Sequence, residues 1–129
     1  MRKQMKVMAA LAAAAVMALS TAMTSFAETG WVQRGSAWYY YHANGTMATN
    51  QWVKSNSGLF WIQPDGTMGT NMWVKNGDNW YYVDGAGESV TGWHEIGGKW
   101  YYFYSDFTMA ADTMIDSYKV GKDGAWIAE

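Results

Sequence analysis

The sequence predicts an all-β fold made of repeated hairpins, and three observations support this. An aromatic run, Trp38-Tyr39-Tyr40, returns at residues 80–82 and 100–102. A single tryptophan stands seven residues before each run and before residue 59, and these four tryptophans are 21, 21 and 20 residues apart. Turns that contain glycine separate the aromatic and β-branched segments, as they do in hairpins. Such a period indicates a repeat architecture whose units pack on their neighbours. We therefore expect a β-hairpin solenoid of four to five repeats of about 20 residues.

The first 27 residues have the pattern of a helical signal peptide. Three positive charges lie within residues 1–6, an alanine-rich apolar stretch fills residues 7–23, and Ser25 and Ala27 supply the small residues of a cleavage site. An uncleaved membrane anchor is the alternative, because roughly 17 to 20 apolar residues can span a bilayer. We favour cleavage after Ala27, which predicts a secreted bacterial protein that begins at Glu28.

Residues 28–129 form the predicted solenoid. We place its repeats at residues 29–50, 51–71, 72–91 and 92–113, followed by a degenerate cap at residues 114–129. The cap keeps Asp123-Gly124 and Trp126 but lacks an aromatic run, as is expected of the terminal repeat of a solenoid. Apolar residues at recurring positions are expected to form a shared core, namely Val32, Val53, Ile62, Val74 and the methionines.

The turn residues predict a register for each hairpin. If Arg34-Gly35 is a two-residue turn, Trp31 lies directly opposite Trp38. The same argument makes turns of Asn76-Gly77 and Ile96-Gly97, and it sets Trp73 opposite Trp80 and Trp93 opposite Trp100. Because side chains alternate along a strand, Tyr40, Tyr82 and Tyr102 share the tryptophan face, whereas Tyr39, Tyr81 and Tyr101 are expected to pack on the other face.

The second hairpin departs from this pattern. It keeps Trp52, but Leu59 stands where the first hairpin has Trp38, and Trp61 stands where it has Tyr40. The third repeat also departs, because its tail reads Gly87-Glu88-Ser89 and lacks the methionine.

Composition and charge narrow the classes of function. The chain has no cysteine, which excludes a disulfide scaffold, a thiolate metal site and a cysteine nucleophile. From residue 28 onward there are six Lys and Arg residues against eleven Asp and Glu residues, which argues against nucleic acid or an anionic membrane as the partner. An acidic, aromatic-rich surface suits a cationic or a neutral ligand better. No metal, cofactor or catalytic residue is expected, because nothing in the sequence pairs a nucleophile with a base.

The repeat unit Gly-Trp-x(6)-Trp-Tyr-Tyr-x(4)-Gly-x-Met-x-Thr resembles the choline-binding, or cell-wall-binding, repeat of Gram-positive surface proteins. Residues 30–49 match this unit throughout, and residues 92–109 match it except that Phe107 replaces a glycine. The resemblance covers essentially all of residues 28–129. It implies a left-handed β-solenoid with ligand sites between consecutive hairpins.

In choline-binding members of that family, two aromatic residues of one hairpin and one of the next form a cage, with a methionine nearby. Carried over by position, the resemblance implies two cages with all three walls, one cage whose third wall is not placed, and one cage that lacks a wall. The first joins Trp31 and Trp38 to Trp61, and the third joins Trp73 and Trp80 to Tyr102. The fourth contains Trp93 and Trp100, with Tyr118 as a possible partner. The incomplete second cage has Trp52 and Tyr82 and lacks a wall at Leu59.

The resemblance and the aromatic rows predict a non-catalytic module that binds choline groups on teichoic acid at the cell wall. A quaternary ammonium cannot donate a hydrogen bond, so aromatic faces are its main means of recognition. Two alternatives stay open. The same rows could stack on the sugar rings of a glucan or a host glycan, or they could pair two copies of the chain as a homodimer.

Overall fold

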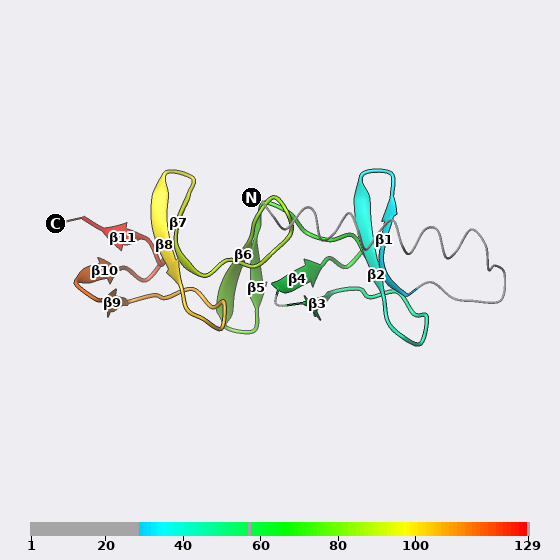
Figure 1. Ribbon diagram of the computed structural model, residues 1–129. Helices are drawn as coiled ribbons and strands as arrows, with labels where there is room; N and C mark the ends of the chain where they lie inside the picture. Colours follow the sequence, from blue (N-terminus) through cyan, green and yellow to red (C-terminus); the bar gives the residue numbers. More distant parts are fainter. Residues whose placement is uncertain (1–28, 57, 129) are drawn as a thin grey trace. The chain divides into compact units, whose positions relative to one another are not determined.

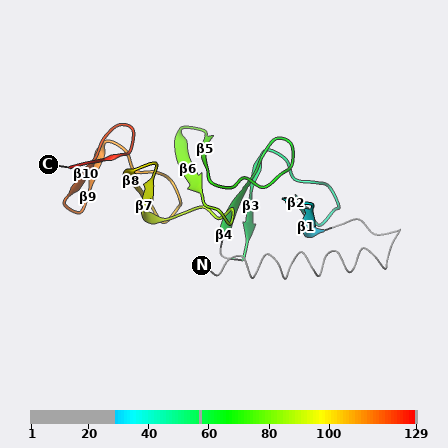
Figure 2. The ribbon, with the colours of Figure 1, turned by 90° about the horizontal axis from the view of Figure 1, so that it is seen from above.

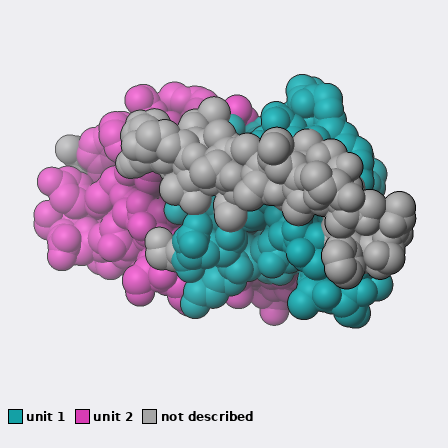
Figure 3. Space-filling view, turned by 45° about the vertical axis from the view of Figure 1, so that its right-hand side comes forward, with its two compact units in different colours: residues 1–70, 85–88 teal, residues 71–84, 89–129 magenta. Residues whose placement is uncertain are grey.

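The computed structural model describes residues 29–56 and 58–128, and this part of the chain is all-β (Figure 1). Within it there is no helix long and apolar enough to cross a membrane. The predicted signal peptide at residues 1–27 lies outside the described residues. The chain divides into two compact units, coloured separately in Figure 3: unit 1 is Met1–Thr70 with Gly85–Glu88, and unit 2 is Asn71–Asp84 with Ser89–Glu129.

Four antiparallel hairpins and a terminal three-stranded sheet make up the fold (Figures 1 and 2). Unit 1 holds the hairpins β1–β2 (Gly30–Arg34, Ala37–Tyr41) and β3–β4 (Gln51–Ser55, Gly58–Ile62). Unit 2 holds the hairpins β5–β6 (Met72–Asn76, Asn79–Val83) and β7–β8 (Gly92–Ile96, Lys99–Phe103). The terminal sheet of unit 2 consists of β9 (Thr113–Ile115), β10 (Tyr118–Val120) and β11 (Trp126–Ile127), in the order β11-β10-β9.

The predicted pairing of the two strands in each hairpin is wrong, because each turn lies one residue later in the chain than expected. Trp31 lies opposite Tyr40, and Trp38 lies opposite Gln33, because the turn is Gly35-Ser36 and not Arg34-Gly35. The third and fourth hairpins show the same shift: Trp73 lies opposite Tyr82 and Trp93 opposite Tyr102. The turn glycines Gly35, Gly77 and Gly97 have φ values of 64°, 67° and 62°. A tight hairpin turn needs positive φ at its first central residue, and glycine adopts it without strain.

This correction leaves the predicted faces intact. Moving a turn by one residue moves each cross-strand partner by two, and side chains alternate with a period of two. Trp31, Trp38 and Tyr40 therefore share one face of the first hairpin, with Trp38 diagonal to Trp31. The two indole rings lie 6.5 Å apart in an edge-to-face arrangement, and those of Trp73 and Trp80 lie 6.2 Å apart.

A tight tail turn follows the second strand of a repeat and closes against it. Met47 bridges to Tyr41, Met68 to Ile62 and Met109 to Phe103. In each of these three tails an Asn or Asp side chain accepts hydrogen bonds from the backbone N–H and the hydroxyl of the threonine two residues on: Asn44 with Thr46, Asp65 with Thr67, and Asp106 with Thr108. This is the Asx-turn arrangement.

The hydrogen bonds in the tails also lower two carboxyl pKa values. The backbone N–H and then the hydroxyl of Thr67 hold the pKa of Asp65 below 3.8, and the hydroxyl and then the backbone N–H of Thr108 do the same for Asp106. Hydrogen bonds to a carboxylate favour its charged form. Both side chains are exposed, so the tails depend only weakly on these charges.

Small clusters of buried side chains form the core of each unit. Val32, Val53 and Ile62 are buried in unit 1, and Val74, Val83 and Phe103 are buried in unit 2, so the predicted aliphatic core positions are confirmed. The prediction that the methionines belong to the core is wrong for Met47 and Met114, which are 38% and 55% exposed. The methionine of one tail packs on the glycine of the next. A Cβ atom at Gly66 would lie 2.7 Å from Cε of Met47, and one at Gly87 would lie 2.6 Å from Cε of Met68. Glycine at these positions therefore leaves the space that the methionine occupies.

Candidate ligand-binding cavities

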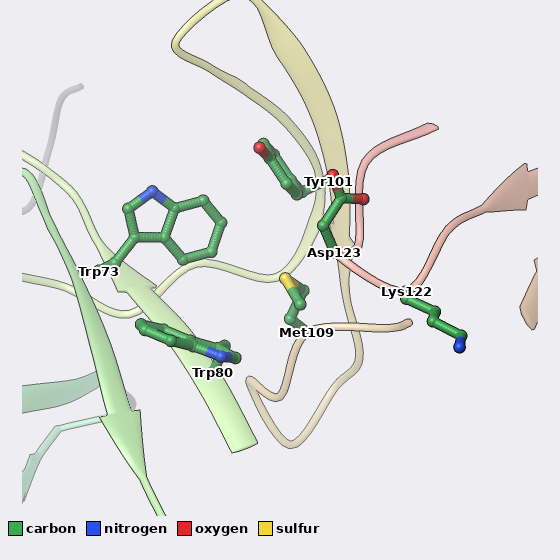
Figure 4. Close-up of a pocket in the computed structure, with 6 residues that line it drawn as sticks. All are labelled: Trp73, Trp80, Tyr101, Met109, Lys122 and Asp123. Carbon is green, nitrogen blue, oxygen red and sulfur yellow. The ribbon is translucent and has the colours of Figure 1, made fainter. Parts of the chain in front are cut away.

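A cavity of about 350 Å³ in unit 2 is bounded by aromatic rings and a methionine. Its lining residues are Trp73, Trp80, Tyr101, Met109, Lys122 and Asp123 (Figure 4). We call it the Trp73 cavity. In Figure 4 the rings of Trp73, Trp80 and Tyr101 border the same space, whereas the amine of Lys122 points away from it. The walls are therefore mainly aromatic, and the lining also includes the carboxylate-bearing residue Asp123.

The strands fix the walls of the Trp73 cavity. Trp73 on β5 and Trp80 on β6 share one face of their hairpin, and Tyr101 comes from β8 with its ring 4.9 Å from that of Trp73. Met109 is held by its backbone, because its N–H donates to the carbonyl oxygen of Trp80 at 2.8 Å. Two consecutive repeats thus build one cavity.

A second cavity of about 250 Å³ lies between the fourth hairpin and the terminal sheet. Its lining residues are Trp93, Trp100, Tyr118 and Trp126, and we call it the Trp93 cavity. The ring of Tyr118 lies 5.9 Å from that of Trp93 and 6.2 Å from that of Trp126, edge-to-face in both cases. Trp100, Tyr118 and Trp126 are more than 40% exposed. Three of the four walls are thus open to solvent and accessible to a ligand.

The backbone shows that the two cavities use equivalent positions. The carbonyl oxygen of Gly121 accepts a hydrogen bond from the N–H of Gly124, and the N–H of Gly121 donates one to the carbonyl oxygen of Ala125. Tyr104 makes the same two backbone hydrogen bonds with Phe107 and Thr108. The Asp123 carboxylate accepts from the Ala125 N–H as the Asp106 carboxylate accepts from that of Thr108. These matches place Tyr118 at the position of Tyr101 and Trp126 at the position of Met109. The terminal sheet is thus a shortened repeat that still completes a site.

Unit 1 contains the same set of walls around the first hairpin. Trp31 packs on Trp38 and on Phe60, whose ring lies 5.2 Å away. Met68 packs against this cluster, and its N–H donates to the carbonyl oxygen of Trp38 at 2.8 Å. Phe60 and Met68 correspond to Tyr101 and Met109 of unit 2, so the arrangement occurs once in unit 1 and twice in unit 2.

The second hairpin does not have the full set of wall residues. Leu59 lies opposite Lys54, at the position that Trp80 and Trp100 fill elsewhere. Trp52 pairs instead with Trp61, and their rings lie 4.9 Å apart. Trp52 belongs to unit 1 and Tyr82 to unit 2, so the site expected from that pair stays a prediction.

The third aromatic residue beside the first and third hairpins differs from the expected one. Trp61 and Tyr102 are the expected residues, but Phe60 packs on Trp31 and Tyr101 lines the Trp73 cavity. Tyr102 contacts Trp93 of its own hairpin, with rings 5.3 Å apart. The reason is geometric: the next hairpin turns its opposite face toward the first one, so the middle aromatic residue is the one that reaches across. Tyr118 lies where it was considered as a partner of Trp93, whereas Trp126 was not considered.

Charged residues beside the cavities differ between the two. Lys75 lies opposite Trp80 in the hairpin, with its amine 5.9 Å from the centroid of the Trp80 ring. At the equivalent position, Glu95 lies opposite Trp100. A carboxylate near a cavity favours a cation within it, and an amine disfavours one. No group of three or more metal-ligating side chains occurs among the described residues.

Aromatic walls suit one chemical class of ligand. Tryptophan and tyrosine faces attract a cation whose charge lies within about 6 Å of the ring centroid. A cation that cannot donate hydrogen bonds is weakly hydrated, so removing it from water into such a site costs little free energy. The fold and the cavities therefore define a β-hairpin repeat protein with cavities lined mainly by aromatic residues.

Comparison with known protein families assigns this chain to a family of repeat proteins. Residues 90–126 match the choline-binding repeat, and residues 29–47 and 71–89 match the cell wall binding repeat. The chain belongs to the choline-binding, or cell-wall-binding, repeat family, whose proteins associate with the cell wall. No curated protein matches the chain.

Solved structures from the pneumococcus are similar to it. CbpJ of Streptococcus pneumoniae is 40% identical over 77% of this chain and 34% of its own, with a TM-score of 0.68. Choline binding protein F of the same organism is 37% identical over 78% of this chain and 34% of its own, also at 0.68. A cell wall endolysin from phage Cp-1, solved with choline, is 26% identical over 75% of this chain and 30% of its own, at 0.63. The chain thus spans about a third of these proteins, and such repeats also occur in enzymes.

Proposed function

We propose that this protein is a non-catalytic module that attaches to the cell wall by holding choline groups of teichoic acid in its aromatic cavities. The observation that carries the proposal is the Trp73 cavity, with three aromatic walls and a methionine from two consecutive repeats. The Trp93 cavity repeats this arrangement at matching backbone positions, and the same kinds of wall residue recur around Trp31, which is 2% exposed in the core of unit 1. Under this proposal the repeats stack as a solenoid within each unit, and the leader exports the chain to the surface.

Several weak sites suit a polymer better than a free small molecule. One aromatic face contributes on the order of 0.5–2 kcal/mol to binding a cation. A site with three faces then binds with roughly millimolar affinity, since about 4 kcal/mol corresponds to about 1 mM. Teichoic acid carries many choline groups on one chain, so binding at one cavity raises the effective concentration at the next and increases avidity.

The Trp93 cavity favours a cation over a sugar. Sugar sites place hydrogen-bonding side chains around the ring hydroxyls to fix its orientation. The described lining of the Trp93 cavity consists of three tryptophans and a tyrosine, without a carboxylate or an amide. A glycan would find stacking surface there but few polar partners.

Co-sedimentation with cell walls tests the proposal. Walls that carry choline should deplete the protein from solution, and free choline should release it. Walls that carry ethanolamine in place of choline are the matched control, because the primary ammonium keeps the charge but prefers hydrogen-bonding partners. Equal binding to both walls, or release by glucan and not by choline, would overturn the proposal in favour of a glycan. A mass that rises with protein concentration and no wall binding would favour pairing of two copies.

A further inference from the structure

We propose that Trp126 is a specificity-determining residue and that it makes the Trp93 cavity the tightest cation site of the chain. The inference rests on the proposed function and deepens it, because it ranks the cavities and names the residue that sets the rank. Trp126 occupies the backbone position of Met109, so the Trp93 cavity has a fourth aromatic wall where the Trp73 cavity has a thioether.

The geometry of Trp126 fits a wall and not a core residue. Its side chain is 41% exposed, and its ring lies 6.2 Å from that of Tyr118 at an interplanar angle of 76°. Met109 differs, because it packs on Gly124 of the following tail turn. The indole of Trp126 thus lines the cavity and stays open to solvent, whereas the methionine at the equivalent position packs on the next tail turn.

Local charge does not rank the two cavities. Glu95 lies opposite Trp100 at the Trp93 cavity, and the Trp73 cavity has Lys75 opposite Trp80 but also the carboxylate of Asp123 in its lining. These charges are exposed, so salt screens them. The aromatic wall is therefore the difference that ranks the two cavities at physiological ionic strength.

Trp126 also borders a second hollow of about 240 Å³, on the side of Met114, Lys119 and Ile127. Exposed apolar residues there, Met114 at 55% and Ile127 at 42%, could be covered by another molecule. The test must therefore separate cation binding at Trp126 from self-association.

The experiment is a choline titration of the full protein followed by NMR. The indole N–H signal of Trp80 reports on the Trp73 cavity, and that of Trp100 reports on the Trp93 cavity. In the wild type, the Trp100 signal should reach its midpoint at a choline concentration on the order of five-fold lower than the Trp80 signal, since one additional face contributes about 1 kcal/mol. Trp126→Met should bring the Trp100 midpoint up to that of Trp80 and leave the Trp80 midpoint unchanged. Trp126→Phe should keep most of the difference, because it keeps an aromatic face.

Three outcomes would overturn the inference. Equal midpoints for Trp80 and Trp100 in the wild type would remove the ranking while leaving choline binding intact. Loss of affinity in Trp126→Phe as large as in Trp126→Met would show that bulk, and not the aromatic face, matters. A Trp126→Met effect that changes with protein concentration, measured by sedimentation, would assign the residue to contacts between copies. If neither signal responds to choline at all, the proposed function fails first.

Discussion

The methionine–glycine contacts between tails lead to a prediction about Ser89 and Phe107. In the third tail, Ser89 stands at the methionine position, and Phe107 stands at the glycine position of the tail that follows. Ser89 is buried and its hydroxyl has no hydrogen-bond partner, while Phe107 has φ at 77°. We infer that the two exchanges compensate each other, because the small serine leaves room for the phenylalanine ring.

A double-mutant cycle measures this compensation. Ser89→Met alone should destabilise the protein by about 1–3 kcal/mol, because it overpacks the space beside Phe107. Phe107→Gly alone relieves strain of about 1 kcal/mol from the left-handed backbone but loses the packing of the ring. The double variant restores the contact made by Met68 and Gly87, so it should be more stable than the sum of the single changes by about 1–3 kcal/mol.

Urea unfolding followed by tryptophan fluorescence gives these values. The slope of stability against urea should be the same in all four proteins, since a change in slope would indicate that the unfolding reaction itself has changed. Single changes that add to within about 0.5 kcal/mol would refute the reasoning, because residues without a shared contact are additive at that level.

Two further predictions concern the walls and the tails. Tyr101→Ala should abolish the response of the Trp80 indole signal to choline, whereas Tyr102→Ala should leave that response in place; the reverse pattern would restore the wall expected from the sequence. Replacing Asp65 and Asp106 by Asn should remove part of the acid sensitivity of folding. Their carboxylates have lowered pKa values in the folded state, so they stabilise the fold fully above pH 3.8 and lose that contribution as the pH falls through the lowered values. Asn44 makes the same two hydrogen bonds without a charge, so the variant should fold normally. Unfolding midpoints measured from pH 2 to 7 that fall equally in both proteins would contradict this prediction.

The hairpins and their faces could be predicted from the sequence because both depend on local chemistry. The repeated tryptophans, the alternation along each strand and the glycine turns are enough to place Trp31, Trp38 and Tyr40 on one face. The exact pairing was missed, because a glycine can fill either central position of a two-residue turn. The φ of Gly35 shows that it fills the first.

The walls contributed by the next repeat could not be predicted in the same way. Whether Tyr101 or Tyr102 reaches Trp73 depends on how one hairpin packs on another, and strand periodicity says nothing about that packing. Trp126 was missed for a different reason. The cap lacks an aromatic run, and the Asp123-Gly124 turn is the feature that aligns it with the tail of the fourth repeat. The Asp residue of that turn places Trp126 at the methionine position.

The central claim is that the aromatic cavities bind choline, and a calorimetric titration of the full protein with choline chloride tests it most directly. Trp80 and Trp100 are 39% and 42% exposed, so Trp80→Ala and Trp100→Ala should each remove one site without unfolding the chain. Tyr104→Ala is the matched control, because Tyr104 is 39% exposed and does not line either cavity. The account predicts saturable binding near the millimolar range, lower stoichiometry in each tryptophan variant and an unchanged curve in the control. A flat titration, with sodium chloride as the salt reference, would contradict it.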